Sequence, residues 1–132
     1  MKGYTFNPQI IDHHLKSYKG KGKMVMMDLR ELKVRMPDKS IINIEETPHF
    51  KYCNGNQEPY KDFLKQWFRQ DEYQSSLNSL EYLMTDDHYY LEGKHSEDYI
   101  RCGQDLVIRD GVHRAARLVH LRVQEVPVII ED

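Results

Sequence analysis

The stretch Leu106-Val-Ile-Arg-Asp-Gly-Val-His-Arg-Ala-Ala-Arg-Leu118 decides how this chain is interpreted. Its apolar beginning, Leu106 to Ile108, predicts a strand, and the pair Asp110-Gly111 predicts a turn. We expect a helix directly after the turn, because apolar residues recur there at spacings of three and four, at Val112, Ala115, Ala116 and Val119.

The residues around this stretch extend the prediction to a whole fold. A buried strand is expected at 126–130, where Pro127 indicates an edge position or a strand start because proline has no N–H to donate. Extended segments are expected at 24–29 and 39–44, with a turn at Pro37-Asp38. A helix is predicted over 60–70, with Tyr60, Phe63, Leu64 and Trp67 as its core face, and a second one from 75 or 76 to 84. The order of these elements predicts an α+β fold, a small mixed sheet with packed helices.

The chain divides into a lead-in and one domain. Residues 1–23 are polar and are expected to be partly flexible, either as a solvated loop or as a basic arm that touches a phosphorylated ligand or partner. Residues 24–132 are expected to form the single domain, because a chain of 132 residues is long enough for one buried core.

The turn at 110–114 has the composition of an oxyanion site. A helix N-terminus presents free N–H groups and partial positive charge, and Gly111 can adopt a positive φ and let a ligand approach the backbone. His113 and Arg114 add hydrogen-bond donors, while Asp110 can cap the helix, bind a metal ion or act as a base. The plain alternative is an ordinary strand–turn–helix with an Asp cap and a solvated His-Arg pair.

Residues Asp110 to Ala116, followed by Val126-Pro-Val128, resemble the central motif of the ParB/sulfiredoxin superfamily. The match covers the last third of the chain, and the front, at 24–32, 47–49 and 60–64, resembles the family more loosely. The resemblance implies a ParB/sulfiredoxin-like fold and nucleotide binding, with the phosphates held by Gly111, His113 and Arg114. The residues alone predict an oxyanion site, and only the resemblance identifies the anion as a nucleotide.

Departures from the family pattern narrow the expected activity. Val112 stands where sulfiredoxins carry their reactive cysteine, so we do not expect sulfinic acid reduction. Since the sequence stops shortly after Ile130, we also do not expect a full partition protein with its DNA-binding and dimerisation domains. The Asp-Gly-x-His-Arg pattern resembles the free-serine kinase branch, which implies an ATP-dependent kinase that phosphorylates a hydroxyl group of a small molecule with Mg²⁺. The alternatives are a nucleotide-binding switch without chemistry and a ParB-like DNA-binding or nuclease module.

Two further polar clusters are candidates to complete a site. Glu45-Glu46-Thr-Pro-His49 is expected to be a loop or strand end, in which Glu46 or His49 can position an acceptor hydroxyl and take its proton; the alternative is a solvated loop. Asp86-Asp-His88 with His95 is a weaker candidate for a divalent metal. For the magnesium of a nucleotide, Asp110 is the expected ligand, alongside phosphates and water.

Composition excludes some partners. The net charge of −2 gives no basic excess, so nucleic acid binding is not expected. The chain contains neither a long apolar run nor a signal peptide pattern, so we expect a cytoplasmic protein without a membrane partner. Cys53 and Cys102 lack metal-ligand spacing and are expected to be reduced thiols, although the sequence leaves a disulfide open. The sequence leaves the oligomeric state and the acceptor open.

Overall fold

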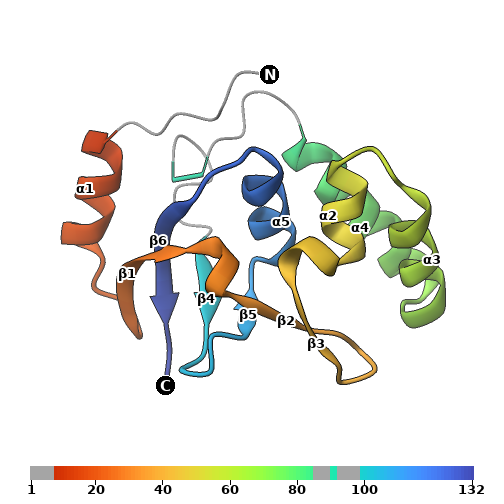
Figure 1. The fold of residues 1–132 in the computed structure, drawn as a ribbon, viewed down its shortest axis with the longest axis horizontal. Helices are drawn as coiled ribbons and strands as arrows, with labels where there is room; N and C mark the ends of the chain where they lie inside the picture. Colours follow the sequence, from red (N-terminus) through yellow and green to blue (C-terminus); the bar gives the residue numbers. More distant parts are fainter. Residues whose placement is uncertain (1–7, 85–89, 92–98) are drawn as a thin grey trace.

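A computed structural model describes residues 8–84, 90–91 and 99–132. Helices and a small mixed sheet form an α+β fold, as predicted (Figure 1). The helices are α1 (Pro8–Ser17), α2 (Pro48–Cys53), α3 (Glu58–Trp67), α4 (Gln70–Leu83) and α5 (Val112–His120). The strands are β1 (Lys23–Asp28), β2 (Lys33–Arg35), β3 (Ile41–Asn43), β4 (Ile100–Cys102), β5 (Ile108–Asp110) and β6 (Glu125–Ile130), with 3₁₀ turns η1 (Leu29–Glu31) and η2 (Ile44–Glu46).

The main sheet has the strand order β1-β6-β4-β5. β6 pairs antiparallel with β1 and parallel with β4, and β4 pairs antiparallel with β5, so the predicted mixed pairing is confirmed. The hairpin β2–β3 turns at the predicted Pro37-Asp38 and lies beside β5 through a single bridge, Lys33 to Val107. The hairpin therefore extends the sheet at its β5 edge, where the chain leaves the sheet through the turn at 110–111.

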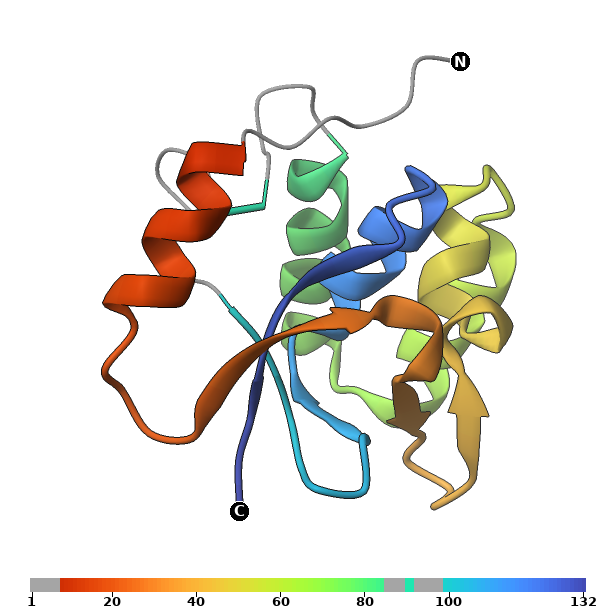
Figure 2. The same ribbon diagram turned by 60° about the vertical axis from the view of Figure 1, so that its left-hand side comes forward.

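Helix α5 lies at the centre of the fold, between the sheet and the other helices (Figure 1). Its apolar face packs into the core, with Ala115 and Ala116 at 0% exposure and Val112 half-buried. Helices α2 and α4 pack on its far side, and α3 packs on α2 and α4. Helix α1 lies apart from these, beside β6 (Figure 2). Helix α5 and the helices that pack on it thus form one layer against the sheet. The N-terminus of α5 lies between this helical layer and the strands.

The structure corrects several predicted boundaries. Residues 8–17 of the expected lead-in form α1, because Ile10 and Ile11 pack against the core. The strand before the turn is 108–110 and not 106–108, since Leu106 adopts a positive φ of 64° in the preceding turn. Helix α4 begins at Gln70, five residues before the predicted start at Ser75. The segment 45–49 is not a loop: Thr47 caps α2 by accepting the N–H of Phe50.

β6 is a central strand, so of the two positions predicted for Pro127 the edge strand is wrong, and Pro127 lies near the start of the strand, as its third residue. β4 pairs with β6 only from Val128 onward, so no strand of the sheet pairs with Pro127 on that side. The hydroxyl of Tyr90 takes this place: it donates to the Pro127 carbonyl at 2.9 Å and accepts the N–H of Ile100 at 2.9 Å. Proline is tolerated here because its missing N–H faces a side chain and not a strand.

The described residues contain no helix long and apolar enough to cross a membrane.

The bridging hydroxyl of Tyr90 makes the first prediction. Tyr90→Phe should lower the free energy of unfolding by about 1–3 kcal/mol, because it leaves the Ile100 N–H and the Pro127 carbonyl without a buried partner. Urea unfolding measures this. Tyr73→Phe is the matched control and should have little effect, since the structure shows no hydrogen bond from the half-buried Tyr73 hydroxyl to any described residue. Equal stability of the two variants would contradict the bridging role.

Candidate functional site

A cleft of about 710 Å³ opens at the N-terminus of α5. One side is formed by the β2–β3 hairpin and by β5, and the other by α2 and by the end of α3. Four of the predicted site residues line it together: His49, Asp110, Gly111 and His113. The segments that meet here are far apart in the sequence, so the packing of the hairpin and of α2 against α5 creates the cleft.

Gly111 is needed at the turn for two reasons that the structure makes explicit. Its φ of +102° lies in the left-handed region, as the sequence suggested, and it is the N-cap residue directly before α5. A Cβ here would lie 3.1 Å from the Cα of Ile100 in β4. The missing side chain therefore lets the turn pack against the sheet, and because Gly111 also lines the cleft, the approach of a ligand to its backbone stays a prediction.

Among the described residues, no side chain caps the N-terminus of α5. The expected cap, Asp110, is the last residue of β5 and is exposed, and no side chain accepts a hydrogen bond in the cap position. The N–H of Ala115 is satisfied by the Gly111 carbonyl at 2.8 Å. The N–H groups of the first turn lie N-terminal to Ala115, at the cleft, where an uncapped helix end attracts anions.

Two histidines and a tyrosine form a tight aromatic cluster at the base of the cleft. The ring of His49 lies edge-on to that of His113, with centroids 4.8 Å apart, and edge-on to that of Tyr60, at 5.0 Å. Tyr60 reaches the Nε2 of His113 with its hydroxyl at 2.7 Å. His49 is 6% exposed, and its Nδ1 is buried with no hydrogen-bond partner among the described residues.

Burial keeps both imidazoles neutral. Desolvation, and to a lesser extent the proximity of His113, lowers the pKa of His49 to about 3. Desolvation alone lowers the pKa of His113 to about 4. The His113 ring therefore carries no positive charge at neutral pH, which favours phosphate binding through the N–H groups of the turn over binding through this ring.

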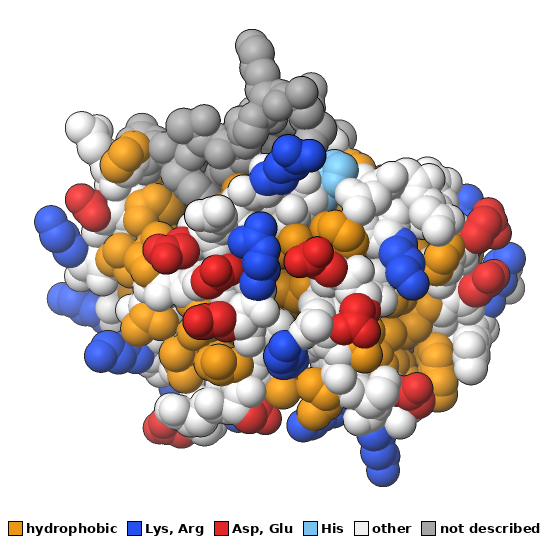
Figure 3. Space-filling model, in the orientation of Figure 1, with side chains coloured by type: hydrophobic (Ala, Val, Ile, Leu, Met, Phe, Trp, Pro, Cys, Tyr) orange, Lys and Arg blue, Asp and Glu red, His pale blue; other side chains and the backbone are white. Residues whose placement is uncertain are grey.

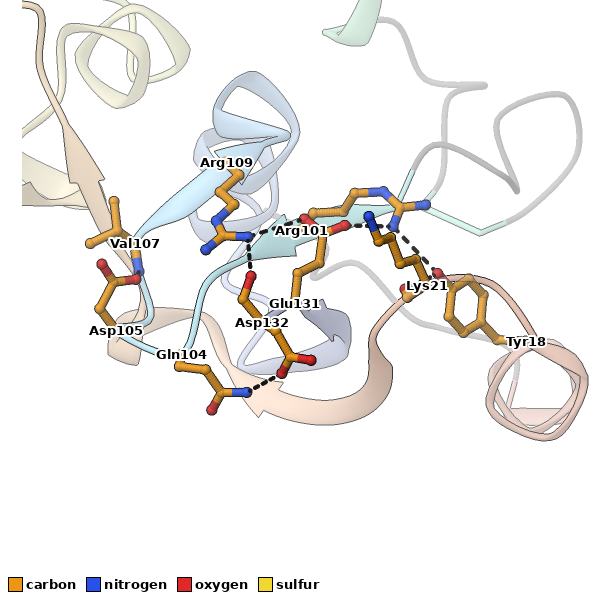
Figure 4. Close-up of polar contacts among 9 residues, drawn as sticks. All are labelled: Tyr18, Lys21, Arg101, Gln104, Asp105, Val107, Arg109, Glu131 and Asp132. Carbon is orange, nitrogen blue, oxygen red and sulfur yellow. Dashed lines mark hydrogen bonds and ion pairs between the residues drawn. The ribbon is translucent and has the colours of Figure 1, made fainter.

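Two arginines in the cleft were missed by the sequence analysis. Arg35 on β2 is exposed and forms no ion pair with any described residue. Arg109 on β5 is engaged by the two residues that follow β6: it donates to the Asp132 carbonyl at 3.0 Å and lies 3.8 Å from the Glu131 carboxylate (Figure 4). Arg35 has no local sequence signature, because only the packing of the hairpin beside β5 brings it to the cleft.

Arg114 and Glu46 lie outside this cleft. The Arg114 guanidinium lies 5.9 Å from the ring centroid of Tyr90, and its side chain lines a separate hollow along α4. Glu46 is exposed, accepts the N–H of Asn43 at 3.3 Å and lines another hollow, beside Arg30. The structure therefore separates these two residues from the other four predicted site residues.

The described residues contain no group of three or more His, Cys, Asp or Glu side chains that would hold a metal ion. Asp110 remains the predicted ligand for a nucleotide-bound magnesium, which needs only one or two carboxylates besides phosphates and water. The second predicted cluster, Asp86 to His88 with His95, lies outside the described residues. Cys53 and Cys102 are both buried free thiols, as expected.

The neutral histidines predict a pH dependence of stability. Below pH 6.5 the unfolded chain protonates these groups, whereas the folded chain does not until about pH 4 for His113 and about pH 3 for His49. Stability should therefore be full above pH 6.5 and fall as the pH drops, with a slope approaching about 1.4 kcal/mol per pH unit for each histidine. Urea unfolding between pH 6.5 and 5 measures the slope.

His49→Leu should reduce this slope by about half. Cys53→Ala is the matched control in the same helix: it should lower stability at every pH and keep the slope, because burial raises the pKa of the Cys53 thiol to about 11, far above this window. A slope unchanged by His49→Leu would show that His49 is not buried in its neutral form.

Comparison with known proteins identifies no relative of this chain. No protein family model matches the sequence, and neither a curated protein nor a solved structure shows a significant match. The interpretation of the cleft therefore depends on its own residues.

Proposed function

We propose that this protein binds a nucleotide in the cleft at the N-terminus of α5 and transfers the terminal phosphoryl group of ATP to a hydroxyl group of a small molecule. One observation carries the proposal: the N-terminus of α5, which no described side chain caps, and Arg35, which forms no ion pair with a described residue, line the same cleft. Backbone N–H groups at a helix start and a guanidinium are the usual partners of phosphate oxygens. The buried, unpartnered Nδ1 of His49, beside the same turn, is a second polar group without a protein partner.

The apolar residues of the cleft suit the base of the nucleotide. Phe63 and Phe68 line the cleft, their ring centroids 5.7 Å apart at an interplanar angle of 63°. Val112 and Pro37 add further apolar surface. Apolar surface in the same cleft as a phosphate-binding turn is the combination that a nucleotide requires, since its base is flat and apolar on its faces and its phosphates are charged.

The resemblance to the ParB/sulfiredoxin superfamily supports the same assignment. The glycine turn between β5 and α5, followed by β6 in a mixed sheet, has the element order on which that resemblance is based. We propose a ParB/sulfiredoxin-like fold on this ground, with the phosphates at the backbone of Gly111, Val112 and His113. Arg35 then takes the role that the resemblance gave to Arg114.

The proposed reaction assigns separate roles to the groups in the cleft. Asp110 is proposed to bind the magnesium that neutralises the phosphates, because its carboxylate is exposed beside the turn. The acceptor oxygen forms a bond to the terminal phosphorus, the bond from this phosphorus to the bridging oxygen breaks, and its electron pair leaves with ADP. The hydroxyl proton passes to a hydrogen-bond acceptor in the cleft or to water. Such transfer depends mainly on positioning and on neutralised charge, so a strong base is not required.

A nucleotide-binding switch without chemistry is the second candidate. It is favoured by the position of Glu46, which lies in a different hollow, and by the burial of His49, whose pKa of about 3 makes it a weak base. A switch and a kinase share the binding site and differ only in turnover, so the two tests below are separate.

The binding proposal predicts a thermal shift. ATP or another nucleotide with Mg²⁺ should raise Tm in a screen of ATP, ADP, CTP and GTP, because a ligand that binds only the folded state stabilises it. Arg35→Ala should weaken binding by about tenfold or more, the usual effect of losing a charged hydrogen bond. Arg30→Ala, an exposed arginine outside the cleft, is the control and should bind as the wild type does. No shift with any nucleotide would refute both candidates.

The kinase proposal predicts release of ADP that depends on both Mg²⁺ and a hydroxyl compound. Asp110→Asn should lower this turnover by about 100-fold or more, the effect of removing one group that neutralises charge in the transition state. Asp62→Asn, an exposed acid on α3 outside the cleft, is the matched control. Nucleotide binding with background turnover for every acceptor in a panel of polyols, hydroxy acids and sugars would favour the switch.

A further inference from the structure

Tyr60 connects the cleft to the helical layer through His113. Its side chain is fully buried on α3, between α4 and α5. The hydroxyl has two neighbours, the Ser76 carbonyl at 3.1 Å and the His113 Nε2 at 2.7 Å. Tyr60 does not line the cleft, so it acts on a ligand only through His113.

Counting protons at this hydroxyl fixes the state of His113. A backbone carbonyl only accepts hydrogen bonds, so the Tyr60 hydroxyl donates its single proton when it bonds to Ser76, and with this geometry the Nε2 of His113 is the donor to the tyrosine oxygen. Burial raises the pKa of Tyr60 well above its usual range, so the hydroxyl keeps its proton. Since the His113 ring is neutral, its other nitrogen, Nδ1, carries a lone pair.

The His113 ring is also held in place from two sides. Tyr60 lies perpendicular to it, with centroids 5.9 Å apart, and His49 lies edge-on at 4.8 Å. No described residue is a hydrogen-bond partner of the His113 Nδ1, and His113 lines the cleft. The lone pair is therefore available to a ligand in a fixed position.

We propose that Tyr60 is a positioning residue that holds His113 as the Nε2–H tautomer, so that the cleft presents a hydrogen-bond acceptor at Nδ1. The group of the ligand that meets this nitrogen must then be a donor, a hydroxyl or an ammonium group, and not a phosphate oxygen. This inference rests on the proposed function for the identity of the donor, which we assign as the acceptor hydroxyl of the phosphoryl transfer. The phosphates are consequently confined to the backbone N–H groups and Arg35.

The tautomer is measured without any ligand. In protein labelled with ¹⁵N-histidine, long-range ¹H–¹⁵N correlation spectra near neutral pH distinguish protonated from unprotonated ring nitrogens, and the loss of one signal set in His113→Gln assigns His113. The wild type should show Nε2 protonated and Nδ1 bare, with an NOE from the Nε2 proton to the Tyr60 ring. Predominant Nδ1–H in the wild type, or no such NOE, would overturn the proposal.

Tyr60→Phe keeps the ring and removes only the hydroxyl, so it should convert His113 to a mixture of both tautomers. Tyr52→Phe is the matched control: this buried tyrosine contacts the Tyr60 ring, its hydroxyl donates to Glu81 at 2.9 Å, and its loss should leave the His113 spectrum unchanged. An unchanged Nε2–H signature in Tyr60→Phe, or an equal change in Tyr52→Phe, would refute the role of Tyr60.

Kinetics test the assignment of the donor separately. In the ADP-release assay, Tyr60→Phe should lower kcat by up to about 100-fold, the lower end of the contribution of a positioned proton acceptor, and leave the KM for ATP unchanged. If Tyr60 had only a structural role, Tyr60→Phe would instead lower Tm and leave both kcat and KM near those of the wild type. That result would refute the assignment of the acceptor hydroxyl as the donor to His113. If the wild type shows the expected tautomer and binds no nucleotide, the proposed function fails and the positioning role of Tyr60 stands.

Discussion

The left-handed backbone of Gly111, packed against Ile100, is the constraint on which the arrangement of this protein depends. It lets β5 end and α5 begin within one residue, while the turn stays in contact with β4. A side chain at this position would be strained at this positive φ and would crowd the backbone of the neighbouring strand. Because α5 is the helix on which α2 and α4 pack, the position of most of the helical layer follows from this turn.

The same turn explains why the cleft is both polar and closely packed. The helix begins without a side-chain cap, so the partial positive charge at its start is available to a ligand. One residue further on, His113 is drawn into the aromatic cluster with Tyr60 and His49, where burial removes its charge. Charge for an anion is therefore supplied by backbone groups and by Arg35, whereas the imidazole supplies an uncharged acceptor.

The distribution of charge around the cleft also limits its partners. On the face shown in Figure 3, basic and acidic side chains are interspersed, without a broad field of one sign. Arg109 and Arg101 share the carboxylate of Glu131, at 3.8 and 3.5 Å, so part of the positive charge near β5 is already neutralised within the protein (Figure 4). A small anionic ligand that meets one free arginine fits this pattern better than a long polyanion does.

The sequence by itself determined the elements whose signals are local. The apolar spacing of α5, the glycine of its turn, the Pro37-Asp38 hairpin and the mixed character of the sheet are set by short-range periodicity and turn chemistry, and the structure confirms each. Asp110, Gly111 and His113 share the cleft because they are neighbours on one turn.

Tertiary packing alone decided the rest. Arg35 lines the cleft because the hairpin lies beside β5. Glu46 and Arg114 line other hollows because the buried faces of η2 and α5 fix the sides on which these two residues lie. Pro127 fits in the central strand β6 because the distant hydroxyl of Tyr90 bonds to its carbonyl. The proposed hydrogen-bond acceptor of the cleft, on His113, depends on the hydroxyl of Tyr60, which periodicity identifies only as a core residue. Contacts between segments so far apart leave no mark on local sequence, because they depend on which faces are buried against each other.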